Sequence, residues 1–429
     1  MKRYIIACIL SVFVLALYAD EETDFYLYQF NNAKSVVNQL SVVKAATDPN
    51  AQQSDDAGSL YANALHTLLL QYPTVKGNLE LDAADDTAEL LAHHIGLNPE
   101  SAKSVEGIDV AQDLWKLVQD FKNPVVRATA LVAIGKTEST NVLPEVIQLL
   151  KDLNSNRPVD KVAQLASERV AYGAIQALEL LKDPDSYIPV FFASNGWYGF
   201  WVLNRAKEAL PNIGADSSAA FAEVISNPAY TYAQKYLALR SVAASSEEAV
   251  KVYGDIPSDV KSAIAGTALS EAWRIKSSDP TINFDIFSMR KLALTMLAQY
   301  GTQDDTAFLP GNVTYPSIFS LLERSFRYGI DEDEQFKVIE ALKKIGSDGN
   351  DQATAELAYL LNLKGTEFDR GAFTNVDERL IRAIIPAVGY AGAAAGQDTA
   401  KVALRSSLTL NWSPAVRTLL NETYTTLGK

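Results

Sequence analysis

The sequence has 429 residues and a formal net charge of −14 at pH 7, with 52 acidic side chains and 38 basic ones. This balance argues against binding to nucleic acid or to anionic membrane surfaces, because both require a basic surface. The chain has one cysteine, so it can form neither an internal disulfide nor a cysteine metal cluster. We therefore expect no cofactor. We also expect a hydrophobic core without cross-links, because a chain of this length can bury enough apolar surface.

The first segment has the order of a secretory signal peptide. Lys2 and Arg3 precede an apolar run from Tyr4 to Tyr18, and Ala19 supplies the small residue of a cleavage site. The run is shorter than the roughly 20 residues that span a bilayer. We expect residues 1–19 to be removed and the mature chain to be exported to the periplasm or the extracellular space. An uncleaved N-terminal anchor is the alternative.

Residues 20–121 are expected to form an N-terminal helical region and cap. A helix capped by Thr23 or Asp24 is predicted to run through Val43, with a short pairing strand as the alternative. Its aromatic side chains would either dock the terminus on the first helices or form a partner-binding tail: Phe25, Tyr26, Tyr28 and Phe30. Further helices are predicted over 58–72, 86–95 and 108–121. They lack the motif that repeats after them, as end units of a repeat protein commonly do.

The stretch from Asn123 to Leu150 predicts two short helices joined by a tight turn. The first helix carries an apolar stripe at helical spacing and ends at Gly135, where a left-handed C-cap favours glycine. The polar turn Thr137–Asn141 leads to a second apolar stripe over 142–150. Neither helix could bury its stripe alone, so we expect these two helices to pair.

The motif A-L-x-x-I-G, which ends the first of these helices, recurs along the chain. Close or looser copies end at six glycines: Gly135, Gly214, Gly301, Gly346, Gly389 and Gly428. By subtraction, successive glycines are 79, 87, 45, 43 and 39 residues apart. A degenerate unit is therefore expected inside each of the first two gaps, over 170–187 and 236–242. A period near 40 to 45 residues built of helix pairs is typical of an α-solenoid.

This pattern resembles the HEAT-like (armadillo-type) helical repeats, especially the exported bacterial kind. There a V-R-x-x-A-L-x-x-I-G helix precedes a P-x-V/L-x-x-L-L helix, as Val126–Gly135 and Pro144–Leu150 do here. The resemblance covers roughly Asn123–Lys429 and is strongest in the first unit and over Gln335–Leu361. It implies an all-α fold, with a right-handed α-solenoid of HEAT-like helix pairs over residues 122–429. It also implies a surface that binds other proteins, and no particular activity.

The segment SNGWYGFW, from Ser194 to Trp201, has the most unusual composition in the chain. With the preceding Phe191 and Phe192 it places six aromatic residues within eleven positions around glycine turns. Such rings can anchor a protein partner, stack on sugar faces or fill the core between neighbouring repeats. The candidate partner-binding residues are Phe192, Trp197, Tyr198 and Trp201.

Residue types for catalysis or metal binding are few. The histidines are His66 and the adjacent pair His93 and His94, which would point about 100° apart on a helix and make poor joint ligands. The acidic group D-D-x-x-E at 85–89 is similar to motifs that bind magnesium and diphosphate in all-helical prenyl enzymes. It falls at a predicted helix start, where acidic residues stabilise the helix without any ligand.

The sequence thus favours an exported, non-catalytic protein-binding or scaffold module, whose partner is another protein. One alternative is a structural protein of the cell envelope that associates with itself. A second is an α/α-toroid enzyme acting on glycans, which needs two inward carboxylates about 5 to 9.5 Å apart. No membrane span is expected after signal cleavage.

Overall fold

The computed structural model describes residues 23–48, 56–244, 246–274, 277–306 and 317–428. The predicted signal peptide, 1–19, lies outside these residues. The described chain is all-helical and contains no strand, which confirms the predicted all-α class. Within it, no helix combines the length and the apolar character needed to cross a bilayer. The contacts divide the chain into two compact units, Met1–Ala215 (unit 1) and Asp216–Lys429 (unit 2).

Unit 1 begins with helical residues 23–31 and continues through ten helices with two short 3-10 turns. Their bounds are α2 Val36–Ala46, α3 Ala57–Gln71, η1 Tyr72–Thr74, α4 Asn78–Leu97, α5 Pro99–Lys103, α6 Val110–Asp120, α7 Pro124–Lys136, α8 Leu143–Ser155, α9 Lys161–Leu181, η2 Pro184–Ser186, α10 Tyr187–Ser194 and α11 Phe200–Ile213.

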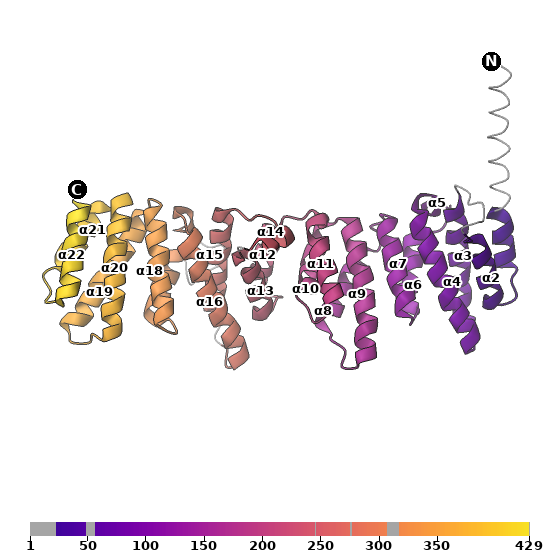
Figure 1. The fold of residues 1–429 in the computed structure, drawn as a ribbon, viewed down its shortest axis with the longest axis horizontal. Helices are drawn as coiled ribbons and strands as arrows, with labels where there is room; N and C mark the ends of the chain where they lie inside the picture. Colours follow the sequence, from indigo (N-terminus) through magenta and orange to yellow (C-terminus); the bar gives the residue numbers. More distant parts are fainter. Residues whose placement is uncertain (1–22, 49–55, 245, 275–276, 307–316, 429) are drawn as a thin grey trace, which may run out of the picture. The chain divides into compact units, whose positions relative to one another are not determined.

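The helices of unit 1 alternate between two layers. In one layer α2, α4, α7, α9 and α11 pack side by side in that order (Figure 1). In the other layer α3 packs on α6, and α8 packs on α10. Consecutive helices pair across the layers: α3 with α4, α6 with α7, α8 with α9 and α10 with α11. We name the first helix of each pair the A helix and the second the B helix.

Unit 2 repeats this plan. Its elements are α12 Ser217–Ser226, α13 Tyr232–Ala243, α14 Glu247–Tyr253, α15 Ser258–Arg274, α16 Pro280–Tyr300, η3 Gln303–Thr306, α17 Ile318–Tyr328, α18 Glu332–Ser347, α19 Asp351–Asp369, α20 Asn375–Ala394, α21 Gln397–Ser407 and α22 Pro414–Leu427. The B helices α13, α16, α18, α20 and α22 form one layer, and each packs on its A helix: α12, α15, α17, α19 and α21. Both units therefore have the arrangement of a helical repeat.

The repeated motif marks equivalent B helices. Its copies lie at the ends of α7, α11, α16, α18 and α22, and inside α20, which continues for five residues after Gly389. The degenerate units predicted inside the two long gaps are also B helices, α9 and α13. In the first copy Ala130, Leu131 and Ile134 are fully buried. The sequence period thus follows from burial of the same helix face in successive pairs.

The sequence predicted the wrong helix as the partner of α7. The sequence favoured a pair made of α7 and α8, joined by the turn Thr137–Asn141. In the structure α7 packs on the preceding α6, whereas α8 packs on the following α9. The turn after α7 therefore connects one pair to the next. Periodicity alone cannot separate these two kinds of turn, because both join antiparallel helices of similar length.

The role predicted for the motif glycine was also wrong. Gly135 lies inside α7, which continues to Lys136, and its φ is not positive. A Cβ atom at Gly135 would lie 2.7 Å from the Cα atom of Ala177 on α9. In unit 2 a Cβ atom at Gly346 would likewise lie 2.5 Å from the Cβ atom of Ala391 on α20. These glycines let neighbouring B helices approach closely; among the motif copies only Gly214 has a left-handed φ, +76°.

The N-terminal region is continuous with the repeats. Helices α4 and α6 both pack on α7, across the change of repeat type predicted near residue 121. Helix α4 begins at Asn78, eight residues before the predicted start, so the acidic group at 85–89 lies inside the helix. Its last turns read L-A-x-x-I-G, ending at Gly96, which is a variant of the repeated motif. The first predicted helix is interrupted, and Ser35 caps a new helix, α2.

Because A and B helices run in opposite directions, each unit has two different edges. One edge carries the turns within pairs, and we name it the pair-turn edge; the opposite edge carries the turns between pairs. Helix ends next to the pair-turn edge hold most of the large apolar side chains that are exposed. In unit 1 these are Leu70, Leu79, Leu81, Val159, Val162, Leu165, Phe200 and Trp201, and in unit 2 they are Ile282, Phe284, Phe287, Tyr328 and Ile330.

Candidate partner-binding surface

The aromatic loop 195–199 joins α10 to α11 at the pair-turn edge of unit 1. The indole Nε1 of Trp197 donates to the carbonyl oxygen of Leu153 at 3.0 Å, and the hydroxyl of Tyr198 donates to Oδ1 of Asn154 at 2.8 Å. Nδ2 of Asn154 in turn donates to the carbonyl of Pro189 at 2.9 Å. The end of α8 therefore holds both α10 and the loop that follows it.

Glu168, on α9, fastens the other end of the loop. Its carboxylate accepts hydrogen bonds from the backbone N–H of Gly199 at 2.9 Å and from Nε1 of Trp201 at 3.0 Å. Glu168 is buried. The ring of Trp201 lies 5.0 Å from the ring of Tyr172, which is on α9 like Glu168. The start of α11 is thereby fixed against the face of α9 that carries Glu168 and Tyr172.

The four predicted partner-binding residues have different surroundings. Tyr198 is buried, and burial together with the nearby Glu168 raises the pKa of its phenol above the ordinary value. Phe192 and Trp197 are half-buried, with Phe192 beside Phe191 at 5.3 Å between ring centroids. Trp201 is 42% exposed. Core filling, one of the roles predicted for these rings, therefore describes Tyr198. Trp201 has the largest exposed fraction of the four side chains.

Exposed apolar side chains that the sequence analysis did not single out lie around Trp201. Phe200 is 77% exposed and Leu165 is 55% exposed. Leu165 precedes Tyr172 by seven residues, which is about two helical turns, so both lie on the face of α9 that Trp201 covers. We name the following five exposed residues of this region the α9–α11 patch: Val159, Val162, Leu165, Phe200 and Trp201.

The α9 part of this patch was not predicted, because the degenerate unit was expected only over residues 170–187. The helix starts at Lys161, capped by Asp160, whose carboxylate accepts from the N–H of Ala163 at 2.8 Å. A signal was present in the sequence. Val162 and Leu165 lie three residues apart in a segment with charged neighbours, outside the apolar stripe that begins at Val170. Such an extra apolar pair at a helix start indicates a second contact face.

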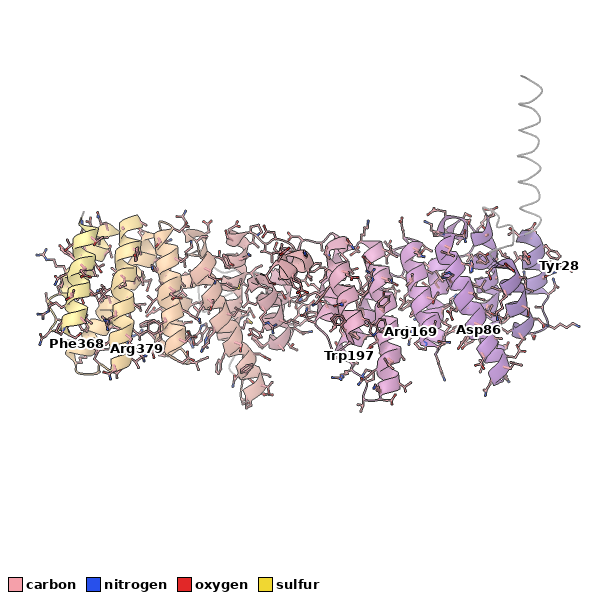
Figure 2. All side chains as sticks on the ribbon, viewed as in Figure 1. Tyr28, Asp86, Arg169, Trp197, Phe368 and Arg379 are labelled. Carbon is pink, nitrogen blue, oxygen red and sulfur yellow. The ribbon has the colours of Figure 1, made fainter. Side chains whose placement is uncertain are left out.

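Three cations surround the α9 part of the patch. Arg157, Lys161 and Arg169 are exposed, and none of them forms an ion pair with any residue in the described part of the chain. The nearby carboxylates are engaged: Asp160 caps α9, and Glu168 binds the start of α11. The patch is therefore apolar with a basic rim, in a chain whose net charge is strongly negative. Figure 2 shows Arg169 and Trp197 in this region.

Within the described residues, no group of histidine, cysteine, aspartate or glutamate side chains could hold a metal ion. The histidines have structural surroundings instead. Nδ1 of His66 lies 2.7 Å from Oδ2 of the buried Asp113, which joins α3 to α6. The rings of His93 and His94 are perpendicular, and burial followed by the charge of His93 lowers the pKa of His94. Burial raises the pKa of Asp85, and the charges of the neighbouring acidic residues raise this pKa further.

Comparisons with known proteins give little further guidance. No protein family and no curated protein matches the sequence. Among solved structures, the chain is similar to the crystal structure of an engineered protein, with 13% sequence identity and a TM-score of 0.31. That alignment covers 95% of this chain and 99% of the other. A similarity at this level carries no argument about fold or function.

Proposed function

We propose that this chain is an exported, non-catalytic scaffold that binds another protein. In this proposal the helix pairs form a right-handed solenoid of HEAT-like repeats, and the signal peptide is removed on export. Stacked repeats offer extended surfaces along which a partner can lie, and each repeat adds a few contacts. The binding free energy is then distributed over the whole contact surface, with aromatic side chains as the main anchors.

The observation that carries this proposal is the α9–α11 patch. It places Trp201 against the face of α9 that also carries the exposed Leu165, with the exposed Phe200 next to Trp201 in the chain and unpaired cations nearby. Soluble proteins rarely leave large apolar side chains clustered in this way unless a partner covers them. A central aromatic and aliphatic group with a charged rim is also the usual composition of a protein interface. The patch rests on rigid helices, so it needs little ordering when a partner binds.

The test compares two matched double variants of the mature chain. Leu165→Ser with Phe200→Ser removes apolar surface from the patch and leaves the hydrogen bonds of Trp197, Tyr198 and Trp201 intact. Tyr390→Ser with Val402→Ser removes similarly exposed apolar side chains, 62% and 65%, from unit 2. Each protein is immobilised and exposed to envelope extract of the source cells, and retained proteins are then purified and rebound to it.

The proposal predicts a purified partner that binds the wild type and the unit 2 variant equally, but binds the patch variant at least about tenfold more weakly. Circular dichroism should show all three proteins equally folded, because every substituted side chain is exposed. A partner that binds the patch variant as tightly as the wild type would contradict the role given to the patch. The absence of any directly binding protein would contradict the function itself.

A further inference from the structure

The α9–α11 patch restricts the chemistry of what can cover it. Val162, Leu165 and Phe200 require apolar side chains opposite them, because burying them against polar groups would leave those groups without hydrogen bonds. The unpaired Lys161 and Arg169 require acidic groups at the rim. A matching segment is therefore short, acidic and apolar on one face.

The beginning of this same chain has that chemistry. Residues 20–24 read D-E-E-T-D, which gives four carboxylates within five residues. They lead into the described helical residues 23–31, in which Phe25 is 54% exposed and Tyr28 is 68% exposed. These two aromatics share a face with the exposed Asp24, whereas Phe30 on the opposite side is buried. The outward face of this helix is thus acidic and aromatic, and no described residue covers it.

We propose that the acidic N-terminal segment, residues 20–31, of one copy of this chain docks on the α9–α11 patch of a second copy. Asp24 and the carboxylates before it would face Lys161 and Arg169, while Phe25 and Tyr28 would lie against Leu165 and Phe200. This inference deepens the proposed binding function and rests on it, because it assigns an occupant to the same patch.

The contact is between copies because the fold separates the two surfaces within one copy. Helical residues 23–31 lie before α2, and α4 and α7 stand between α2 and α9 in the layer of B helices. Figure 2 shows Tyr28 and Arg169 at separate places in unit 1. One such contact joins two different surfaces and is heterologous, so one copy keeps a free patch and the other copy keeps a free segment. Repetition of the contact builds an open chain unless its geometry closes a ring.

The expected association is weak. A single short helix covers much less than the roughly 800 Å² per partner of a standard interface, and contacts of that small size are transient. The mature wild-type protein should therefore show a sedimentation coefficient that rises steadily with protein concentration. Because charge pairs contribute to the contact, the rise should diminish as salt is added.

Two complementary variants test the docking directly. The segment variant carries Glu21→Lys, Glu22→Lys and Asp24→Lys, and the patch variant carries Lys161→Glu and Arg169→Glu. Each alone places like charges across the contact, so each should remain monomeric at concentrations where the wild type associates. In an equimolar mixture, the intact segment of the patch variant meets the intact patch of the segment variant. The remaining pair of surfaces also carries opposite charges, lysines on the segment and glutamates on the patch, so the mixture should recover the concentration-dependent association of the wild type.

The matched control carries Lys401→Glu and Arg405→Glu, which make the same charge change on α21, at the half-buried Lys401 and the exposed Arg405. This control should associate like the wild type, so a loss there would show an effect of net charge alone and overturn the proposal. A mixture of the two complementary variants that stays monomeric would also overturn it. So would a wild type that stays monomeric at every concentration. Binding of the wild type to phosphatidylcholine vesicles, lost in the patch variant and without self-association, would instead assign the patch to a membrane surface.

These outcomes separate this inference from the proposed function. If the chain does not associate with itself but a different protein binds directly through the patch, the docking is wrong and the scaffold function stands. If the chain does not associate with itself and no other protein binds it directly, both are wrong.

Discussion

Replacement of Gly135 by alanine tests whether the repeated motif serves close contact between B helices. The added Cβ atom would lie 2.7 Å from the Cα atom and 3.1 Å from the carbonyl oxygen of Ala177 on α9. Both are backbone atoms of a helix packed on both sides, so a side-chain rotation cannot relieve the clash. Either α7 and α9 separate, or both helices shift within their layer.

The expected loss of stability is the difference between two opposing contributions to the free energy of unfolding. Overpacking by one methyl group costs about 1 to 3 kcal/mol, and the upper value applies because the obstacle is backbone. Alanine in place of glycine within a helix returns about 1 kcal/mol through higher helix propensity. The net free energy of unfolding should fall by about 2 kcal/mol. For a unit of this size that corresponds to a decrease in Tm of about 4 to 8 °C.

Thermal unfolding followed by circular dichroism measures this change, with two glycines as internal references. At Gly96 the nearest atom to a new Cβ is the flexible Cδ of Lys136 at 3.3 Å, so Gly96→Ala should lower the Tm by less. At Gly428 nothing lies closer than 3.6 Å, so Gly428→Ala should leave the Tm nearly unchanged. A Gly135→Ala protein as stable as the wild type would refute the reasoning, as would equal losses at all three positions.

Three further substitutions test interactions inside the units. Arg290→Met removes the partner of the fully buried Glu334, which accepts from the guanidinium at 3.0 Å, and urea unfolding should show a loss of about 3 to 5 kcal/mol. Burial raises the pKa of Asp377, but hydrogen bonds, chiefly from Lys364, outweigh it and hold the pKa below 3.8. This stabilisation exists above the unfolded pKa and disappears as pH falls through the folded pKa, so Asp377→Asn should be less stable at pH 7 and should lose less stability on acidification. Tyr198→Phe should lower stability by about 1 kcal/mol in urea without weakening partner binding.

The repeat architecture was predictable because it depends on local periodicity. Ala130, Leu131 and Ile134 recur at fixed spacing since the same face of each B helix is buried against its neighbours. The period even located α9 and α13, where the motif itself has degenerated. The function of the glycine was not predictable, because its close neighbour Ala177 belongs to a helix 42 residues further along by subtraction.

The candidate surface was only partly predictable for the same reason. Composition identified the loop around Trp201, but burial of Tyr198 depends on Asn154, which lies 44 residues earlier in the chain. The contribution of Leu165 depends on where α9 begins, and helix starts are set by capping residues such as Asp160 and not by the apolar stripe. A sequence therefore indicates which segments are unusual before it indicates which of their side chains remain exposed.

The most direct measurement of the central claim is site-specific photo-crosslinking in the source cells. A photoreactive phenylalanine analogue replaces Phe200 in one variant and Val402 in another, both at exposed positions. We expect a discrete protein adduct from position 200, which mass spectrometry identifies as another protein or as a second copy, and no such adduct from position 402. Irradiation that gives no adduct at position 200, or the same adducts from both positions, would contradict a protein-binding role for this surface.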